Sequence, residues 1–311
     1  MYIKRSLPRH IRIRSKSRRS LIQTIVLLGP AVALLVFSTT NEVDAPATAS
    51  VLPGAPDQGN DTSRALGTSL DAELAAQRGR ASAVIRGAGG EVLYESRSRE
   101  RFELASVGKV FILAAYLDLL ERENREANYW EHEMLTVMIE ESDNRSASDL
   151  WSELNGVEGI QAFLKSRGLE PVDAPHVPEE WGEMRASAFE VSELLAGLYS
   201  GRLLNPQNTR FALNLLGNII DEQAWGVGSV LEGSGLVQTY VKNGWYPEEW
   251  GWTVNSAGIV SDGSGSYVVV MLTESQPSLE AGVRLIEGAV GILRDELLQK
   301  GQQGWPGDST P

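Results

Sequence analysis

The chain has 311 residues, no cysteine and a formal net charge of −13. Its length allows one large domain or two small ones with a substantial core. The lack of cysteine excludes disulfide bonds, thiolate catalysis and cysteine-ligated metal sites. Because residues 1–20 contribute +8, the rest of the chain carries −21. An acidic remainder of this size argues against binding to nucleic acid or to an anionic membrane surface.

The N-terminal region has the order of an export sequence. Residues 1–20 are basic and lack acids, residues 21–39 are mostly apolar, and residues 40–66 are rich in Ala, Pro, Gly, Asp and Thr. This order predicts an export signal, with a twin-arginine-like Ser17–Ile22, or a single membrane anchor with its basic end inside. We expect residues 40–66 to form a flexible linker. The following domain is therefore expected outside the cytoplasm, either anchored or secreted after cleavage.

The rest of the chain alternates between strand and helix patterns. A helix is predicted over 67–76, followed by strands at 81–86 and 91–95 joined by a Gly-rich hairpin turn. Helical patterns then fill the chain from Ser106 to about Leu216, including 147–154, 157–167 and 188–198. Strands return at 236–242, 252–260 and 266–272, a helix closes the domain over 278–298, and 301–311 reads as a disordered tail.

Strands at both ends of the domain, with helices between them, predict an α+β fold over residues 67–300. One antiparallel sheet would be built from both ends of the domain and flanked by helices. The central helical residues would form an inserted all-helical lobe. We find no internal repeat in the sequence.

Ser106 and Lys109 stand near the start of a run, 104–120, that is apolar on nearly every side of a helix. Three residues apart, they share one helical face. A buried lysine is costly unless it is paired or neutralised, which predicts a cleft opening onto this face. After residue 20 the chain has 16 arginines and only four lysines, so ordinary charge is carried by arginine. Unlike arginine, Lys109 can lose its proton and act as a base toward the Ser106 hydroxyl.

Two further short motifs follow in order. Ser142-Asp143-Asn144 is expected in a loop between helices, and Lys242-Asn243-Gly244 at the end of a strand. With Ser106-x-x-Lys109, this triple resembles the motif set of the penicillin-recognising serine hydrolases, which include the class A β-lactamases and the penicillin-binding proteins. The resemblance covers roughly residues 67–300 and is closest over 142–168.

The resemblance implies a role for each motif residue. Ser106 would be the acylated nucleophile, Lys109 its base and Ser142 a proton relay to the leaving nitrogen. Asn144 would hold the amide side chain of the substrate. Lys242, Asn243 and Gly244 would form the wall that receives the substrate carboxylate, with Lys242 helping to keep Lys109 neutral. The backbone N–H groups of Ser106 and Trp245 would form the oxyanion hole.

The sequence departs from the family at two points. Asn243 replaces the usual Thr or Ser of the third motif, where an amide can still donate to a carboxylate. The Glu-x-x-Leu-Asn segment that supplies the deacylating glutamate of class A enzymes is missing from a shortened loop at 170–186. Glu179, Glu180 and Glu183 are the substitutes that this loop offers. We therefore expect acylation followed by slow deacylation.

The predicted activity is that of an exported serine hydrolase acting on a β-lactam or a cell-wall-like peptide amide, without a cofactor or metal. The alternative is a non-catalytic binding or scaffold domain at the cell envelope that keeps the fold. His132 and His176 are too few and too scattered for a metal site. A phosphate loop and a Gly-x-Ser-x-Gly elbow are both missing from the sequence. Membrane contact is expected through the N-terminal helix alone.

Overall fold

A computed structural model of the chain describes residues 58–75, 78–87, 89–231, 238–261 and 265–303. Its centre is a five-stranded antiparallel sheet in the order β2-β1-β7-β6-β5. Strands β1 (Arg80–Gly87) and β2 (Val92–Ser96) come from the start of the domain. Strands β5 (Gln238–Glu248), β6 (Gly251–Ser261) and β7 (Ser266–Glu274) come from its end. The predicted α+β fold, with one sheet built from both ends of the domain, is confirmed.

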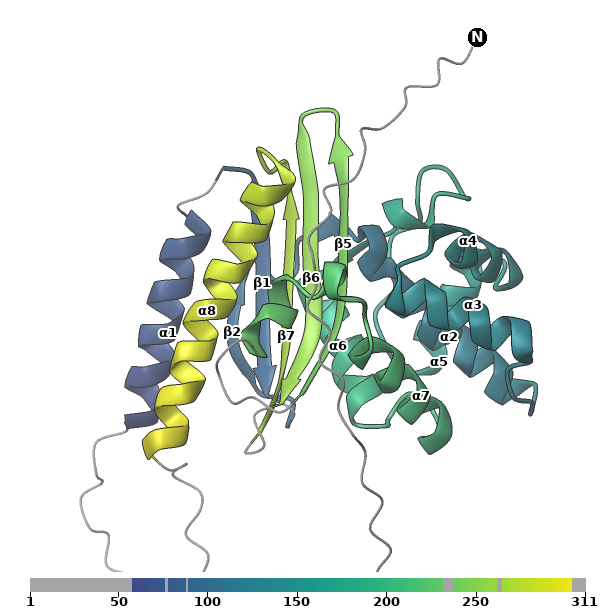
Figure 1. Cartoon of the computed structure of the whole chain (residues 1–311), viewed down its shortest axis with the longest axis horizontal. Coiled ribbons are helices and arrows are strands. Elements are labelled where there is room, and N and C mark those ends of the chain that lie inside the picture. The colour runs from purple at the N-terminus through teal and green to yellow at the C-terminus, as the bar shows by residue number, and fades with distance from the viewer. Residues whose placement is uncertain (1–57, 76–77, 88, 232–237, 262–264, 304–311) are drawn as a thin grey trace, which may run out of the picture. The chain divides into compact units, whose positions relative to one another are not determined.

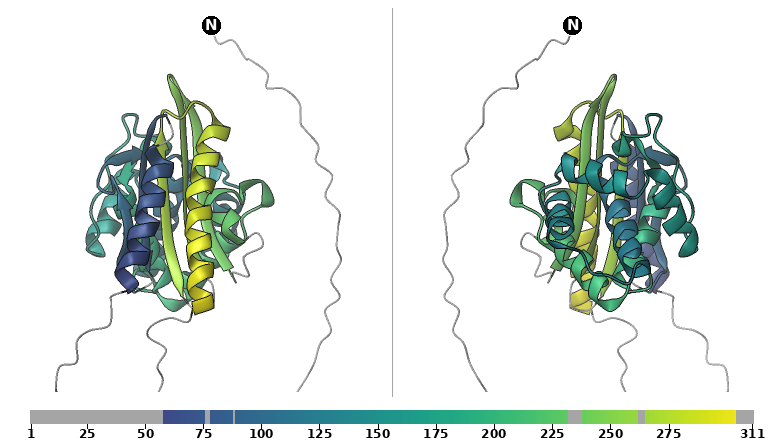
Figure 2. Two further views of the ribbon diagram at one scale, coloured as in Figure 1. Left: turned by 90° about the vertical axis from the view of Figure 1, so that its left-hand side faces the viewer. Right: turned by 90° about the vertical axis from the view of Figure 1, so that its right-hand side faces the viewer.

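Two helices from opposite ends of the domain cover one face of the sheet. They are α1 (Gln58–Ala75) and α8 (Leu279–Gln303), which lie side by side (Figures 1 and 2). Leu70 of α1 and Ile286 of α8 are fully buried in a cluster with sheet residues such as Val269. This apolar layer joins the first and last elements of the domain, because each helix buries its apolar face against the same strands.

The other face of the sheet carries the helical lobe (Figure 1). Its α-helices are α2 (Lys109–Arg122), α3 (Tyr129–Glu140), α4 (Asn144–Glu153), α5 (Val157–Ser166), α6 (Ala188–Tyr199) and α7 (Pro206–Gly217). The 3-10 turns η1 (Ala105–Gly108), η2 (Trp181–Glu183) and η3 (Asp221–Gln223) accompany them, and a further one, η4 (Gly226–Leu231), packs against α8 on the opposite face. Helix α6 packs on β1 and β7, and α2 runs through the lobe with nearly all of its residues buried. A helix that is apolar all round is the one expected at the centre of such a lobe.

The structure differs from the predicted boundaries in several places. Strand β5 continues to Glu248 instead of ending at 242, so the third motif lies within the strand. Helix α1 begins at Gln58, so residues 58–66 are helical and do not belong to the linker; no proline follows Pro56 to stop the helix. Helix α8 runs to Gln303, three residues into the predicted tail; Gln302 and Gln303 are good helix formers, whereas Gly301 is not. The short strands β3 (Arg101–Glu103) and β4 (Arg185–Ser187) pair with each other and were not predicted.

The predicted signal or anchor, residues 21–39, lies outside the described residues and stays a prediction. So do the basic segment 1–20 and the greater part of the linker, 40–57. Within the described ranges, no helix combines the length and apolar character needed to cross a membrane.

Candidate active site

Ser106 lies in the 3-10 turn η1, directly before helix α2. It is partly exposed, and its hydroxyl makes no hydrogen bond with any residue that the structure describes. The preceding Ala105 has a φ of 48°, a left-handed conformation that is strained for a residue with a Cβ. Such strain is often found where a reactive side chain must be presented, so Ser106 is well placed as a nucleophile.

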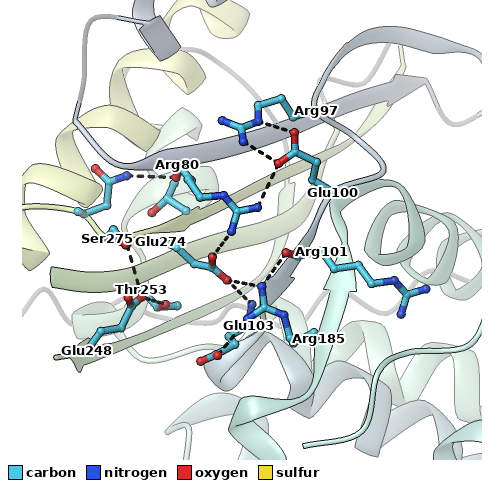
Figure 3. A network of polar contacts seen from close by, with 12 residues as sticks. Arg80, Arg97, Glu100, Arg101, Glu103, Arg185, Glu248, Thr253, Glu274 and Ser275 are labelled. Atoms are coloured by element: carbon cyan, nitrogen blue, oxygen red, sulfur yellow. Dashed lines mark hydrogen bonds and ion pairs between the residues drawn. The ribbon is translucent and has the colours of Figure 1, made fainter. Parts of the chain in front are cut away.

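The backbone just before Ser106 is held by a partly buried polar network (Figure 3). The N–H of Glu103 donates to Glu274 on β7 at 2.9 Å, and Arg185 on β4 bridges the carboxylates of Glu103 and Glu274 at 3.0 and 3.1 Å. Asn255 on β6 donates to the carbonyls of Glu103 and Leu104 at 2.7 and 3.2 Å. These contacts fix η1 to the sheet, and hence fix the position of Ser106.

The side chain of Lys109 is completely buried, with 0% exposure. Its Nζ donates to the backbone carbonyl of Ser142 at 2.5 Å, to the Ser142 hydroxyl at 2.9 Å and to Oδ1 of Asn144 at 2.8 Å. When Lys109 is neutral, its two N–H groups can donate to the Ser142 carbonyl and to Asn144, and the Ser142 hydroxyl can donate to the amine lone pair. The first and second sequence motifs are therefore brought together, although no cleft opens directly onto Lys109.

Burial lowers the pKa of Lys109 to about 7, and the nearby carboxylate of Asp143 opposes this shift. Burial, followed by repulsion from Lys109, holds the pKa of Lys242 well below its ordinary value. Desolvation is the main cause of the lowered pKa of Lys109, and the predicted help from Lys242 stays a prediction.

We expect acylation to depend on pH with a midpoint near the pKa of Lys109. Only the neutral amine accepts a proton, and the pKa is lowered to about 7. The acylation rate should therefore rise about tenfold per pH unit below the midpoint and level off above it. Measuring second-order acylation rates from about pH 5 to 9 tests this expectation.

Asp143→Asn provides a matched variant for this measurement. It keeps a good N-cap for α4, where Asp143 accepts from the N–H of Ser146 at 2.7 Å, and it removes the charge that raises the pKa of Lys109. The midpoint should then move to lower pH. A profile without an inflection, in the natural protein and the variant alike, would rule out Lys109 as the base.

The Ser142–Asn144 loop is shaped by its own backbone. Ser142 has a φ of 60°, again in the left-handed region, and Asp143 begins helix α4 as its N-cap. This geometry turns both Ser142 and Asn144 toward Lys109, as the two hydrogen bonds to its Nζ require. Ser142 is thus within direct proton-transfer distance of the amine.

The third motif lies on the edge strand β5, where its two polar side chains point into the protein. Lys242 is 1% exposed, and its Nζ donates to Oε1 of Gln223 and to the carbonyl of Asn243, both at 3.2 Å. Asn243 is 0% exposed, and its Nδ2 donates to the carbonyls of Gln223 and Trp225 at 2.7 and 2.9 Å. The expected donation from Asn243 to a substrate carboxylate is therefore not available here, because both of its N–H groups have backbone partners.

Gly244 brings β5 close to the backbone of Ser106. A Cβ placed on Gly244 would lie 2.5 Å from the backbone nitrogen of Ser106 and 2.8 Å from that of Val107. Only a glycine allows this contact. Trp245 follows on the same edge strand, so the backbone N–H groups proposed for the oxyanion hole come from neighbouring segments.

Gly244→Ala should impair acylation strongly. The added methyl group must displace the backbone at Ser106, and loss of an oxyanion donor typically costs about 10²–10³-fold in rate. Gly291→Ala is a suitable control, because a Cβ at Gly291 in helix α8 would meet nothing within 4 Å. Equal acylation rates for both variants would show that the approach of β5 to Ser106 has no catalytic role.

Trp181 is a site residue that the sequence patterns did not reveal. It belongs to η2, in the loop where a deacylating glutamate was sought, and its ring centre lies 4.8 Å from Nζ of Lys109. It is 8% exposed, and its Nε1 donates to the hydroxyl of Ser148 at 3.1 Å.

Of the three glutamates considered, Glu179 and Glu180 are exposed, and Glu183 lies near enough to Glu103 to raise the pKa of that carboxyl. Among the described residues, none of the three hydrogen-bonds to Lys109.

A family model described as the beta-lactamase enzyme family matches residues 124–296, which is more than half of the chain. The chain belongs to the β-lactamase enzyme family. The matched range includes the second and third motifs and begins after Ser106 and Lys109. No match was found among curated proteins. Among the residues that the structure describes, this family member has no group of three or more His, Asp or Glu side chains arranged to hold a metal ion.

Solved β-lactamases show the same fold as this β-lactamase family member. A class A β-lactamase from Bacteroides cellulosilyticus is 16% identical, with a TM-score of 0.67, and the match covers 76% of this chain and 99% of that one. The β-lactamase from Sphaerobacter thermophilus is 22% identical, with a TM-score of 0.60 and coverage of 77% and 99%. The class A β-lactamase from Mycobacterium abscessus is 18% identical, with a TM-score of 0.63 and coverage of 75% and 99%.

Proposed function

We propose that the protein is a serine hydrolase of the β-lactamase type that forms an acyl-enzyme on Ser106 and releases it slowly. The observation that carries the proposal is the buried Lys109, held by Ser142 and Asn144, with its pKa lowered to about 7. A neutral amine near a partly exposed serine is the equipment of nucleophilic catalysis. The substrate class supported by the family is the β-lactams or a related cell-wall-like peptide amide.

The proposed acylation follows from the positions of these groups. The Ser106 hydroxyl attacks the substrate carbonyl and passes its proton to the neutral Nζ of Lys109. Ser142, 2.9 Å from Nζ, relays a proton to the departing nitrogen as the C–N bond breaks. The backbone N–H groups of Ser106 and Trp245, brought together at Gly244, stabilise the negative oxygen.

Labelling with a fluorescent penicillin tests this proposal. The natural chain should retain the label after denaturing electrophoresis, and Ser106→Ala should not. Ser142→Ala should label more slowly, because it removes the relay but keeps the nucleophile. A natural chain without label, with intact folding, would support the alternative of a non-catalytic binding or scaffold domain. An equally labelled Ser106→Ala variant would place the nucleophile elsewhere.

We also propose that the domain works outside the cytoplasm, anchored or released by its N-terminal segment. The support is the order of the basic residues 1–20, the apolar residues 21–39 and the acidic remainder. Protease added to intact spheroplasts should then digest the domain, and it should leave a cytoplasmic marker protein whole. Full protection of the domain until the membrane is lysed would contradict this location.

A further inference from the structure

Two kinds of group enclose the amine of Lys109, which is 0% exposed. Ser142 and Asn144 place three oxygen atoms at 2.5, 2.9 and 2.8 Å from Nζ. Trp181 places the face of its ring over the same nitrogen, with the ring centre 4.8 Å away. An indole has no acceptor atom, so the ring occupies space at Nζ without supplying the hydrogen bond that a water molecule would supply there. Trp181 is itself 8% exposed, so at this point one side chain separates the amine from solvent.

The loop that carries Trp181 is tied to helix α4. Nε1 of Trp181 donates to the hydroxyl of Ser148 at 3.1 Å, and Nε1 of Trp151, on the same helix, donates to the carbonyl of Pro178 at 2.9 Å. Helix α4 begins at Asn144, within the second motif. The ring is therefore fixed relative to the oxygen atoms that surround the amine of Lys109.

The turn η2 also packs on the turn η1, which carries the nucleophile. A Cβ placed on Gly108 would lie 3.3 Å from Cε of Met184 and 3.6 Å from the carbonyl oxygen of Trp181. The N–H of Leu104 donates to the carbonyl of Met184 at 3.0 Å. The ring thus belongs to a wall that is held on both sides, by α4 and by the segment at the nucleophile.

The ring of Trp181 has two opposing effects on Lys109. It attracts an ammonium group through its π-face, and it shields the same group from water. Burial can lower the pKa of a lysine by about 3–5 pH units, whereas a ring face raises it by at most about 1–2. Because burial is the main cause of the lowered pKa of Lys109, the shielding outweighs the attraction.

Two charged groups face Lys109 from the other elements packed around it, among the described residues. The carboxylate of Asp143, in the loop before α4, raises the pKa of Lys109. Lys242 on β5 is the second, and Lys109 lowers its pKa. A substitution of Trp181 leaves both groups in the chain, so its effect on Lys109 measures the contribution of the ring.

We propose that Trp181 is a positioning residue for acylation, whose ring excludes water from Nζ of Lys109 and so keeps this amine in the neutral form that accepts the Ser106 proton. The inference rests on the proposed function, since it adds a residue to the same site. Trp181 itself takes no proton and forms no bond to the substrate. The bond changes are those of the acylation above, and Trp181 acts on them only through Lys109.

The pH dependence of acylation by Trp181→Ala tests this inference. Water admitted to Nζ stabilises the ammonium form, so the midpoint should rise by at least about one pH unit. Acylation at pH 7 should then be about fivefold slower or more, while the plateau at high pH stays close to that of the natural chain. Damage to the fold alone would lower the rate at every pH and leave the midpoint in place. Trp181→Phe keeps a ring over the amine and should retain the natural midpoint.

Trp130→Ala is the matched control, because it removes the same side chain from a position on α3 that is 71% exposed. It should leave both the midpoint and the plateau unchanged. Trp181→Leu keeps an apolar side chain but leaves room for water, and it should raise the midpoint by less than the alanine variant. A natural midpoint in both Trp181→Ala and Trp181→Leu would overturn the inference and leave the proposed function standing.

A titration without substrate separates the two proposals. The chain has few lysines, so the signals of lysine labelled with ¹³C at Cε can be followed by NMR from about pH 5 to 10, and Lys109→Arg identifies the signal of Lys109. This signal should titrate at higher pH in Trp181→Ala than in the natural chain. An unchanged titration would overturn the inference. A natural chain that shows the expected titration but is not acylated at any pH would refute the proposed function instead.

Discussion

Lys109→Arg is expected to abolish acylation, with a loss of at least about 10²–10⁴-fold. The substitution preserves the charge, but a guanidinium does not deprotonate near neutral pH and so cannot accept the serine proton. The natural side chain is fully buried and has its pKa lowered to about 7, as the proposed base requires. Stopped-flow measurement of penicillin acylation gives the comparison.

Two controls separate the loss of the base from damage to the fold. Lys165→Arg, on the exposed side of α5, should acylate at the normal rate. Lys109→Ala should also be inactive, and an added small primary amine should restore part of its acylation, because the space left by the side chain can admit the amine. Normal acylation by Lys109→Arg would show that another group is the base.

The second large effect concerns the lifetime of the acyl-enzyme. The ring of Trp181 covers Lys109, while Glu179 and Glu180 are exposed and Glu183 lies by Glu103. None of these carboxylates hydrogen-bonds to Lys109 or Ser106 among the described residues, and general-base help is typically worth about 10²–10⁴-fold. We expect a penicillin adduct that forms and then persists through many minutes of timed mass spectra.

Trp181→Glu should shorten the lifetime of the adduct by about tenfold or more, because it brings a carboxylate toward Lys109 and admits water. Trp181→Gln introduces a side chain of the same shape as glutamate but without a base, and it should retain a long-lived adduct. The difference between the two variants therefore measures the effect of the carboxylate separately from the effect of losing the ring. Rapid steady-state hydrolysis by the natural chain would contradict this explanation. Glu179→Gln, Glu180→Gln and Glu183→Gln would then identify the base that the loop supplies.

Much of the fold could be predicted because the signals are local. The β-branched run at 266–272 is the central strand β7, and the apolar run after Ser106 is the buried helix α2. Strands β3 and β4 are three residues long and pair Arg101 with Ser187, although most of the sequence of the lobe lies between these two residues. Such short, non-local pairing leaves no periodicity to detect.

The site was predictable where a motif fixes local geometry, and not where loops meet. Ser142 and Asn144 meet Lys109 as the order of motifs suggested. The inward turn of Asn243 depends on the backbone of Gln223 and Trp225, which arrive from another segment. Trp181 likewise reaches Lys109 only through the path of its loop, and a single tryptophan in a Pro-rich stretch carries no positional signal.

The most direct test of the central claim is to locate the acyl group by peptide mass mapping. The protein is incubated with a penicillin, quenched in acid, digested and sequenced by tandem mass spectrometry. The account predicts that the peptide containing Ser106 carries the full mass of the penicillin and that the modified residue is Ser106 itself. An adduct on any other residue, or an unmodified Ser106 peptide from folded protein after prolonged incubation with the penicillin, would contradict it.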